Sequence, residues 1–177
     1  MWEALARGRI DSIGSDHVGQ RKTKEEMDKG NVWETLSGFP SRVEVLLPAL
    51  LSEGVNKKRI TIEQVARISA ENPARIWGLY PKKGSISVGA DADLVLVDLN
   101  RSMEISRDTI QSAASWSIFE GWKFKGWPIA TMLRGNVLAR WPEGTNRPII
   151  EDKPMGMYVQ RTADFRDYRR SWRALVR

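Results

Sequence analysis

Asp16 and His17 are the residues whose types and spacing best suit chemistry, because they set a carboxylate beside the only histidine of the chain. A carboxylate and an imidazole are side chains that proteins often use to move protons. The pair closes the stretch IDSIGSDH, whose apolar positions fit a short buried strand that stops at a turn. An Asp in this place is also a common turn former or helix cap, so the residues alone leave both interpretations open.

Composition removes several kinds of site. The chain has no cysteine, which excludes disulfides, thiolate metal sites and a cysteine nucleophile and fits a cytoplasmic protein. No serine stands in a nucleophile-elbow motif, so a Ser-His-Asp triad is not indicated. No apolar run approaches the roughly 20 residues of a membrane span, and no signal-peptide pattern opens the sequence, so we expect no membrane partner.

The formal net charge of +6 raises the question of a polyanionic partner. Much of the positive charge lies in RTADFRDYRRSWRALVR, from Arg161 to Arg177. This stretch fits a solvated helix or a helix that packs between subunits. Nucleic-acid binding is the weaker interpretation, because no nucleic-acid motif accompanies the charge.

The pattern of the chain is helical first and rich in strands later, with the change near residue 82. The segment RVEVLLPALLSEG has apolar residues at helical spacing, with Pro48 as a kink or a start. The predicted helix signals are Gly54 as a stop, a Thr61–Gln64 capping box, Asn72 as an N-cap and Gly78 as a stop. The predicted strands are Ile86–Val88, Leu94–Leu99, MEIS and PIATMLRGNVLARW, the last a hairpin that turns at Arg134-Gly135-Asn136.

Four motifs in this order resemble the cyclic amidohydrolases. They are GSDHVG, GFPSRVEVLLPALLSEGV, ISAENPARIWGLYPKKGSISVGADADLVLVD and EGWKFKGWPIATMLRGNVLA. The resemblance is to the C-terminal part of the proteins in one group, which comprises hydantoinases (dihydropyrimidinases), dihydroorotases and allantoinases. It covers nearly all of residues 1–150. The amidohydrolase superfamily is marked most specifically by KKGSISVGADADLVLVD.

The resemblance implies a fold of class α/β plus β: the last strand and closing helices of a metal-dependent (β/α)₈ TIM barrel, followed by part of a small β-sandwich. Residues 1–81 are expected to end the barrel, with Ile10 to Ser15 as its eighth strand. Residues 82–145 are expected in the sandwich, and residues 146–177 form a basic tail with a helical, subunit-packing pattern. A complete barrel takes about 250 residues, so we expect a fragment, or a half that needs a partner.

The resemblance also implies the site. Asp16 matches the acid that binds a metal ion and serves as the general base, and His17 is expected beside the site without being a ligand. Ser37 and Gly38 stand where hydantoinases bind the imide edge of the substrate through backbone groups. Gln20 stands where dihydroorotases commonly have a histidine, which favours a hydantoinase-like substrate.

The cofactor implied is a divalent metal, a binuclear zinc centre in the complete enzyme, whose other ligands lie upstream of this chain in the family. The expected substrate is a hydantoin, dihydropyrimidine or dihydroorotate-like ring. The expected partners are the remainder of the barrel or a partner chain, and further copies in a homo-oligomer. Alone, the chain is expected neither to hold the metal centre nor to catalyse. The alternatives are a non-catalytic binding or scaffold module that kept the fold, and a basic nucleic-acid-binding protein.

Overall fold

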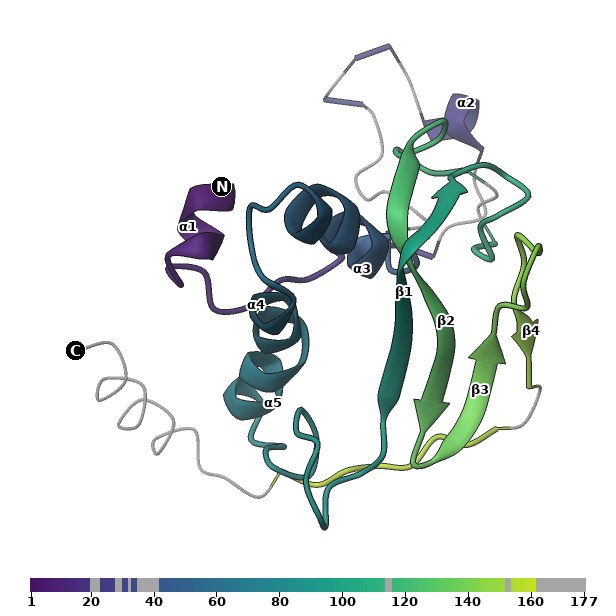
Figure 1. Cartoon of the computed structure of the whole chain (residues 1–177). Helices are drawn as coiled ribbons and strands as arrows, with labels where there is room; N and C mark the ends of the chain where they lie inside the picture. Colours follow the sequence, from purple (N-terminus) through teal and green to yellow (C-terminus); the bar gives the residue numbers. More distant parts are fainter. Residues whose placement is uncertain are drawn as a thin grey trace.

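The computed structural model describes residues 1–19, 23–27, 30–31, 33–34, 42–113, 116–151 and 154–161. In these residues a group of helices lies on one side of a four-stranded antiparallel sheet (Figure 1). The helices come from the first half of the chain and the sheet from the second half. None of the described helices has the length and apolar character needed to cross a membrane.

Two longer helical runs dominate the first half, each made of α-helical and π-helical pieces. The helices are α1 (Trp2–Ala6), α2 (Lys24–Met27), α3 (Leu46–Ala49), η1 (Leu50–Asn56), α4 (Ile62–Ala66), η2 (Arg67–Glu71) and α5 (Asn72–Ile76). The capping box predicted from sequence is confirmed: the Thr61 side chain accepts a hydrogen bond from the Gln64 backbone, and the Gln64 side chain accepts one from the Thr61 backbone.

Two of the predicted helix signals are wrong. Gly54 lies inside η1, where an added Cβ would be only 2.8 Å from Cγ1 of Ile60, so this glycine serves close packing and does not end the helix. Asn72 has helical backbone angles, and its side chain donates a 2.7 Å hydrogen bond to the Asp11 carbonyl oxygen. It therefore ties the helix to the N-terminal segment and caps nothing. Gly78, at a φ of +70°, follows the end of α5 as predicted.

The sheet has the order β1-β2-β3-β4, with every neighbouring pair antiparallel. Its strands are β1 (Leu94–Glu104), β2 (Lys123–Leu133), β3 (Asn136–Arg140) and β4 (Ile149–Ile150). The predicted hairpin is confirmed, since Arg134 and Gly135 connect β2 to β3 with φ angles of +48° and +80°. Two positive φ angles in a two-residue loop are those of a type I′ turn, which matches the twist of the strands.

Two predicted strands do not form in the described residues. Ile86 and Val88 lie in a loop, with relative exposures of 92% and 108%. Residues 10–16 run as an irregular segment along the helices, with a backbone hydrogen bond from Ile13 to the Ile68 carbonyl oxygen at 3.3 Å. A strand exists only beside another strand. In the described part of the chain, the sheet ladders pair only β1 to β4 with one another.

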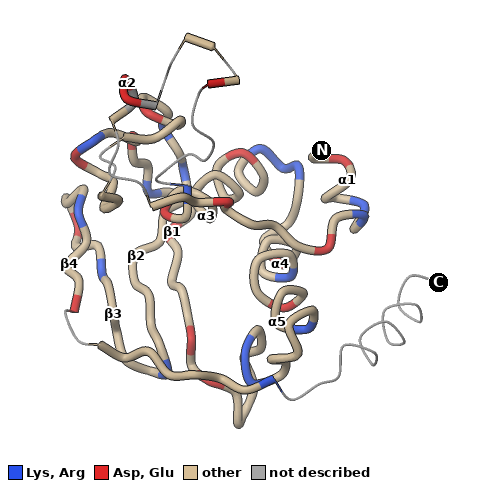
Figure 2. The backbone as a smooth tube through the Cα atoms, turned by 180° about the vertical axis from the view of Figure 1, so that it is seen from behind, with Lys and Arg blue, Asp and Glu red and all other residues tan. Residues whose placement is uncertain are grey.

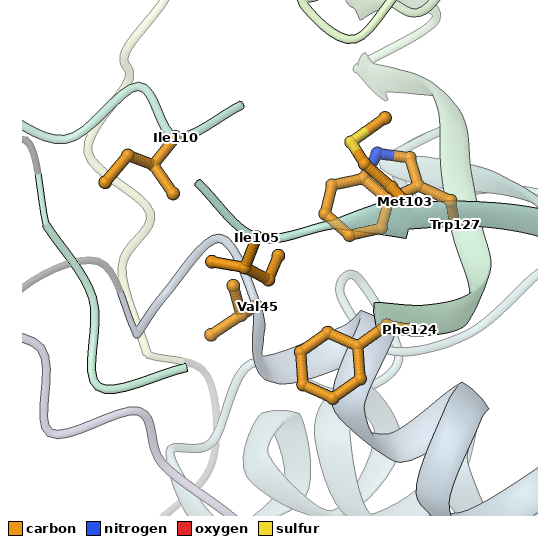
Figure 3. Close-up of a cluster of buried hydrophobic side chains, with 6 residues drawn as sticks. All are labelled: Val45, Met103, Ile105, Ile110, Phe124 and Trp127. Atoms are coloured by element: carbon orange, nitrogen blue, oxygen red, sulfur yellow. The ribbon is translucent and has the colours of Figure 1, made fainter. Parts of the chain in front are cut away.

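The helical run 46–56 lies between two apolar clusters. On the sheet side, Val45 is 1% exposed and packs with Ile105 and Phe124 (Figure 3). On the other side, Leu50 packs with Ile60, Val65, Ile68 and Leu5. Burying one large apolar side chain of this kind contributes about 1.5–3 kcal/mol. The run from residue 46 to residue 56 thus joins the helical part of the molecule to the sheet.

The helical run lies very close to the sheet at Gly126 of β2. Its φ is +104°, and a Cβ built on it would be 2.7 Å from Cβ of Leu51. The register of β1 against β2 is interrupted at the same place, between Asp98 and Ser102 of β1. Glycine is therefore required here both for its backbone angles and for the space.

Gly126→Ala is expected to lower the free energy of unfolding by about 1–3 kcal/mol more than Gly121→Ala does. Gly121 also has a positive φ, of +81°, but a Cβ there meets nothing within 4 Å. Its alanine variant therefore measures the cost of backbone strain without a steric clash. Urea unfolding of both variants measures the difference. Equal losses in the two variants would contradict the close contact with Leu51.

A group of ion pairs joins the end of the helical part to the start of β1, where acidic and basic segments meet in Figure 2. Lys83 Nζ lies 2.8 Å from a carboxylate oxygen of Asp91 and also pairs with Asp93, while Lys82 lies 3.3 Å from Asp91. Hydrogen bonds from Lys83 hold the pKa of Asp91 below its ordinary value, with a smaller contribution from Lys82. Burial lowers the pKa of Lys83, but its contacts with Asp91 and Asp93 raise it more, so the net shift is upward.

The lowered pKa of Asp91 predicts a loss of stability in acid. A carboxyl whose pKa is lower in the folded than in the unfolded chain stabilises the fold above the ordinary carboxyl pKa of about 4, and this contribution disappears as the pH falls below it. Urea midpoints should therefore drop more steeply between about pH 5 and about pH 3 in the original protein than in Asp91→Asn. Asp108→Asn, at a side chain that is 91% exposed, is the control and should follow the original protein. Identical acid profiles for Asp91→Asn and the original protein would refute the prediction.

Candidate functional site

Asp16 occupies a turn with a left-handed backbone, at a φ of +48°. Such an angle is uncommon for a residue other than glycine, although Asp and Asn tolerate it best. The side chain is nevertheless 85% exposed in this chain. The structure therefore presents a carboxylate outward from a constrained backbone, which agrees with the turn interpretation and leaves the chemical one a prediction.

One arginine contacts both residues of the pair. Nη2 of Arg42 donates to the carbonyl oxygen of Asp16 at 2.9 Å and to its carboxylate Oδ2 at 3.0 Å. The backbone N–H of Arg42 donates to Nδ1 of His17 at 3.2 Å. The backbone N–H of His17 donates in turn to Oγ of Ser15 at 3.3 Å. These bonds bring Arg42 to the two neighbouring residues that the sequence singled out.

The contact to Nδ1 determines the chemistry open to His17. A nitrogen that accepts a hydrogen bond carries no proton, so the neutral ring carries its hydrogen on Nε2. The imidazole is half-buried, and its Nδ1 is committed to the Arg42 backbone. This arrangement favours a role in orienting the turn over a role as a metal ligand.

Arg42 is anchored, through the residues that follow it, to the loop between β1 and β2 and to the apolar cluster beside the sheet. The carboxylate of Glu44 accepts hydrogen bonds from the backbone N–H groups of Gln111 at 2.6 Å and Ser112 at 2.8 Å. Val45 then enters the apolar cluster beside the sheet. Neither Arg42 nor Glu44 stood out in the sequence. Their place just before an apolar helix was the available signal, but it does not reveal which distant groups they contact.

The described residues hold only part of the predicted site. Asp16 and His17 lie together, whereas Ser37, Gly38 and Gln20 lie outside the described residues. Among the residues that are described, no group of three or more His, Cys, Asp or Glu side chains could hold a metal ion. A zinc site requires three or four protein ligands. The described residues therefore offer one carboxylate and do not by themselves fit a metal centre.

Comparison with known proteins gives consistent matches. The sequence profile described as the amidohydrolase family matches residues 1–138. An L-hydantoinase of Paenarthrobacter aurescens is 35% identical over 161 residues, which are 91% of this chain and 34% of that protein. A dihydroorotase of Halobacterium salinarum is 38% identical over 138 residues, covering 78% of this chain and 31% of that protein.

A solved structure shares the fold as well. The L-hydantoinase (dihydropyrimidinase) from Arthrobacter aurescens superposes with a TM-score of 0.72 at 37% identity, over 78% of this chain and 31% of that one. The D-hydantoinase (dihydropyrimidinase) from a Thermus species also has a TM-score of 0.72, at 33% identity. The chain thus spans about a third of the length of the relatives that it matches.

The donor set predicts weak metal binding by these 177 residues alone. Isothermal titration with zinc should show no tight, stoichiometric binding, because scattered carboxylates and one imidazole do not form a zinc site. Asp16→Asn is the matched control and should titrate like the original chain. Tight binding of one or two zinc ions that the Asn substitution removes would overturn the prediction.

Proposed function

This chain belongs to the amidohydrolase family, and we propose that it forms the C-terminal part of a hydrolase that opens cyclic amides. The names of its relatives, which are hydantoinases, a dihydropyrimidinase and dihydroorotases, support this class of reaction. The structural observation that carries the proposal is the placement of the Asp16 side chain. Its carboxylate stands exposed on a constrained left-handed turn within the residues that match the family.

The proposal assigns a place in a larger fold to each part of the chain. Residues 1–81 complete the wall of a TIM barrel, residues 82–145 contribute to a small β-sandwich, and residues 146–177 form the basic tail. The segment Ile10 to Ser15 becomes the eighth barrel strand when neighbouring strands are present to bond it. The superposition on hydantoinases roughly three times as long supports this assignment.

Asp16 has two tasks in this proposal. It would hold, as one carboxylate ligand, a divalent metal centre, a binuclear zinc site whose other ligands would come from residues outside this chain. When bound, the metal would supply Lewis-acid chemistry that lowers the pKa of the attacking water. The carboxylate of Asp16 accepts the proton of that water and delivers it to the ring nitrogen, so that the C–N bond breaks with a neutral leaving group.

The remaining residues orient the reactants. His17 fixes the shape of the turn through its ring and backbone contacts. Backbone groups of Ser37 and Gly38 bind the imide edge of the substrate. Gln20, in the place of a histidine common in dihydroorotases, favours a hydantoin or dihydropyrimidine ring over dihydroorotate.

The proposed surroundings follow from the same assignment. The partners are the small cyclic amide, the remainder of the enzyme and further copies of it in a homo-oligomer. The cytoplasm is the proposed location, on the absence of cysteine from the chain. The comparisons give no support to a non-catalytic scaffold module or a nucleic-acid-binding protein, and we propose neither.

The test is made in the complete protein that contains these residues. Asp16→Asn should lower the rate of ring opening by at least about 100-fold, because it removes a proton acceptor as well as a charged ligand. His17→Asn should cost much less. The rate is followed by the loss of ultraviolet absorbance of hydantoin, dihydrouracil and dihydroorotate.

Asp11→Asn is the control, because Asp11 lies in the same segment and its carbonyl oxygen, not its side chain, accepts the hydrogen bond from Asn72. It should leave the rate near that of the original protein. Near-normal turnover of Asp16→Asn would refute the role of Asp16. A loss in His17→Asn equal to that in Asp16→Asn would show that the two roles are ranked wrongly.

A further inference from the structure

We propose that Arg42 is a positioning residue that holds the Asp16-His17 turn in its working shape. The inference rests on the proposed function for the importance of that turn, but its geometry and its test are independent of catalysis. Arg42 does not touch the reacting atoms in this proposal. It acts through the two residues that it contacts.

Arg42 contacts both Asp16 and His17. The side chain of Arg42 donates to two different oxygens of Asp16, the carbonyl and Oδ2, at 2.9 and 3.0 Å. Its backbone donates to the ring of His17 at 3.2 Å. A bond to the carbonyl restrains the left-handed backbone, and a bond to Oδ2 restrains rotation of the carboxylate about that contact.

The two partners differ in exposure, and the difference shows which one is the anchor. The Arg42 side chain is 21% exposed, against 85% for Asp16. Arg42 directly precedes a segment that is tied to the loop between β1 and β2 by the two hydrogen bonds of Glu44, and to the apolar cluster beside the sheet by the buried Val45. The fixed residue is therefore Arg42, and the turn of Asp16 is the part that it orients.

Because Asp16 is exposed, its ion pair with Arg42 can orient the turn without adding much to the stability of the fold. An ion pair with one partner in water is screened and adds little to the stability of a fold. Orientation of one exposed turn requires only a small difference in free energy between its arrangements, which a few directed hydrogen bonds from a rigid element can supply. The three bonds that Arg42 donates to Asp16 and His17 are of this directed kind.

The test is made on the 177-residue chain and uses its single histidine, which gives one imidazole signal set in a nitrogen NMR spectrum. In mildly alkaline solution, where imidazoles are neutral, the original chain should show the hydrogen on Nε2 and a bare Nδ1. Arg42→Met keeps the apolar stem and the backbone N–H but removes the guanidinium that holds Asp16. The turn should then lose its fixed position against residue 42, and the tautomer preference of His17 should be lost with it. Arg42→Lys keeps a cationic donor and should retain the preference.

Arg59→Met is the control, because Arg59 pairs with Glu53 and stacks over Trp2 at a distance from the turn. It should retain the tautomer preference. Retention of the preference in Arg42→Met, or equal loss in Arg42→Met and Arg42→Lys, would overturn the proposal. If Arg42→Met does not fold, Asp16→Asn decides, because it keeps the left-handed turn and removes the charge that Arg42 pairs with. A weakened preference there supports the proposal, and an unchanged one overturns it.

The same readout keeps this inference distinct from the proposed function. The tautomer of His17 does not depend on metal, substrate or turnover. Suppose that Arg42→Met loses the tautomer preference while Asp16→Asn still opens the ring at a near-normal rate. The positioning role of Arg42 would then stand, and the catalytic role of Asp16 would be refuted.

Discussion

The packing of the helical run 46–56 on β2 is the contact on which the rest of the structure depends. Leu51 is fully buried there against Gly126, and the side chain of Asn56 donates a 2.7 Å hydrogen bond to the Lys125 carbonyl oxygen. The run also faces the helical cluster through Leu50. Because the same helix belongs to both apolar clusters, a shift of it against the sheet would disturb both at once.

The position of the candidate site follows from that contact. Residues 42–45 lead directly into the helix, so the packing of the helix on the sheet also determines the position of Arg42. Arg42 then reaches back to the turn of Asp16 and His17, while Glu44 bonds to the loop at Gln111. The turn is thus oriented by a segment that is rigid for reasons of core packing, which is how a small polar site obtains a precise geometry.

How much could be predicted from the sequence depended on how far apart the interacting residues lie. The capping box at Thr61 and the hairpin at Arg134-Gly135 are local, and the sequence predicts both correctly. The positions of Gly54 and Asn72 depend on contacts across the fold, with Ile60 and Asp11, and local signals misplaced them. For the site, adjacency in the sequence revealed Asp16 and His17. Arg42 could not be found in this way, because it meets Asp16 across 26 positions of chain.

The two missing strands have a single physical cause. Residues 10–16 and the Ile86–Val88 loop carry strand-like sequences, yet a strand requires backbone partners that the described residues do not provide. Ile86 and Val88 also expose their side chains to solvent, at 92% and 108%. Under the proposed function, both segments meet strands from the remaining two thirds of the enzyme. Pairing of residues 10–16 on both sides would then convert the Asp16 turn, now held by Arg42 on one side, into the end of a barrel strand.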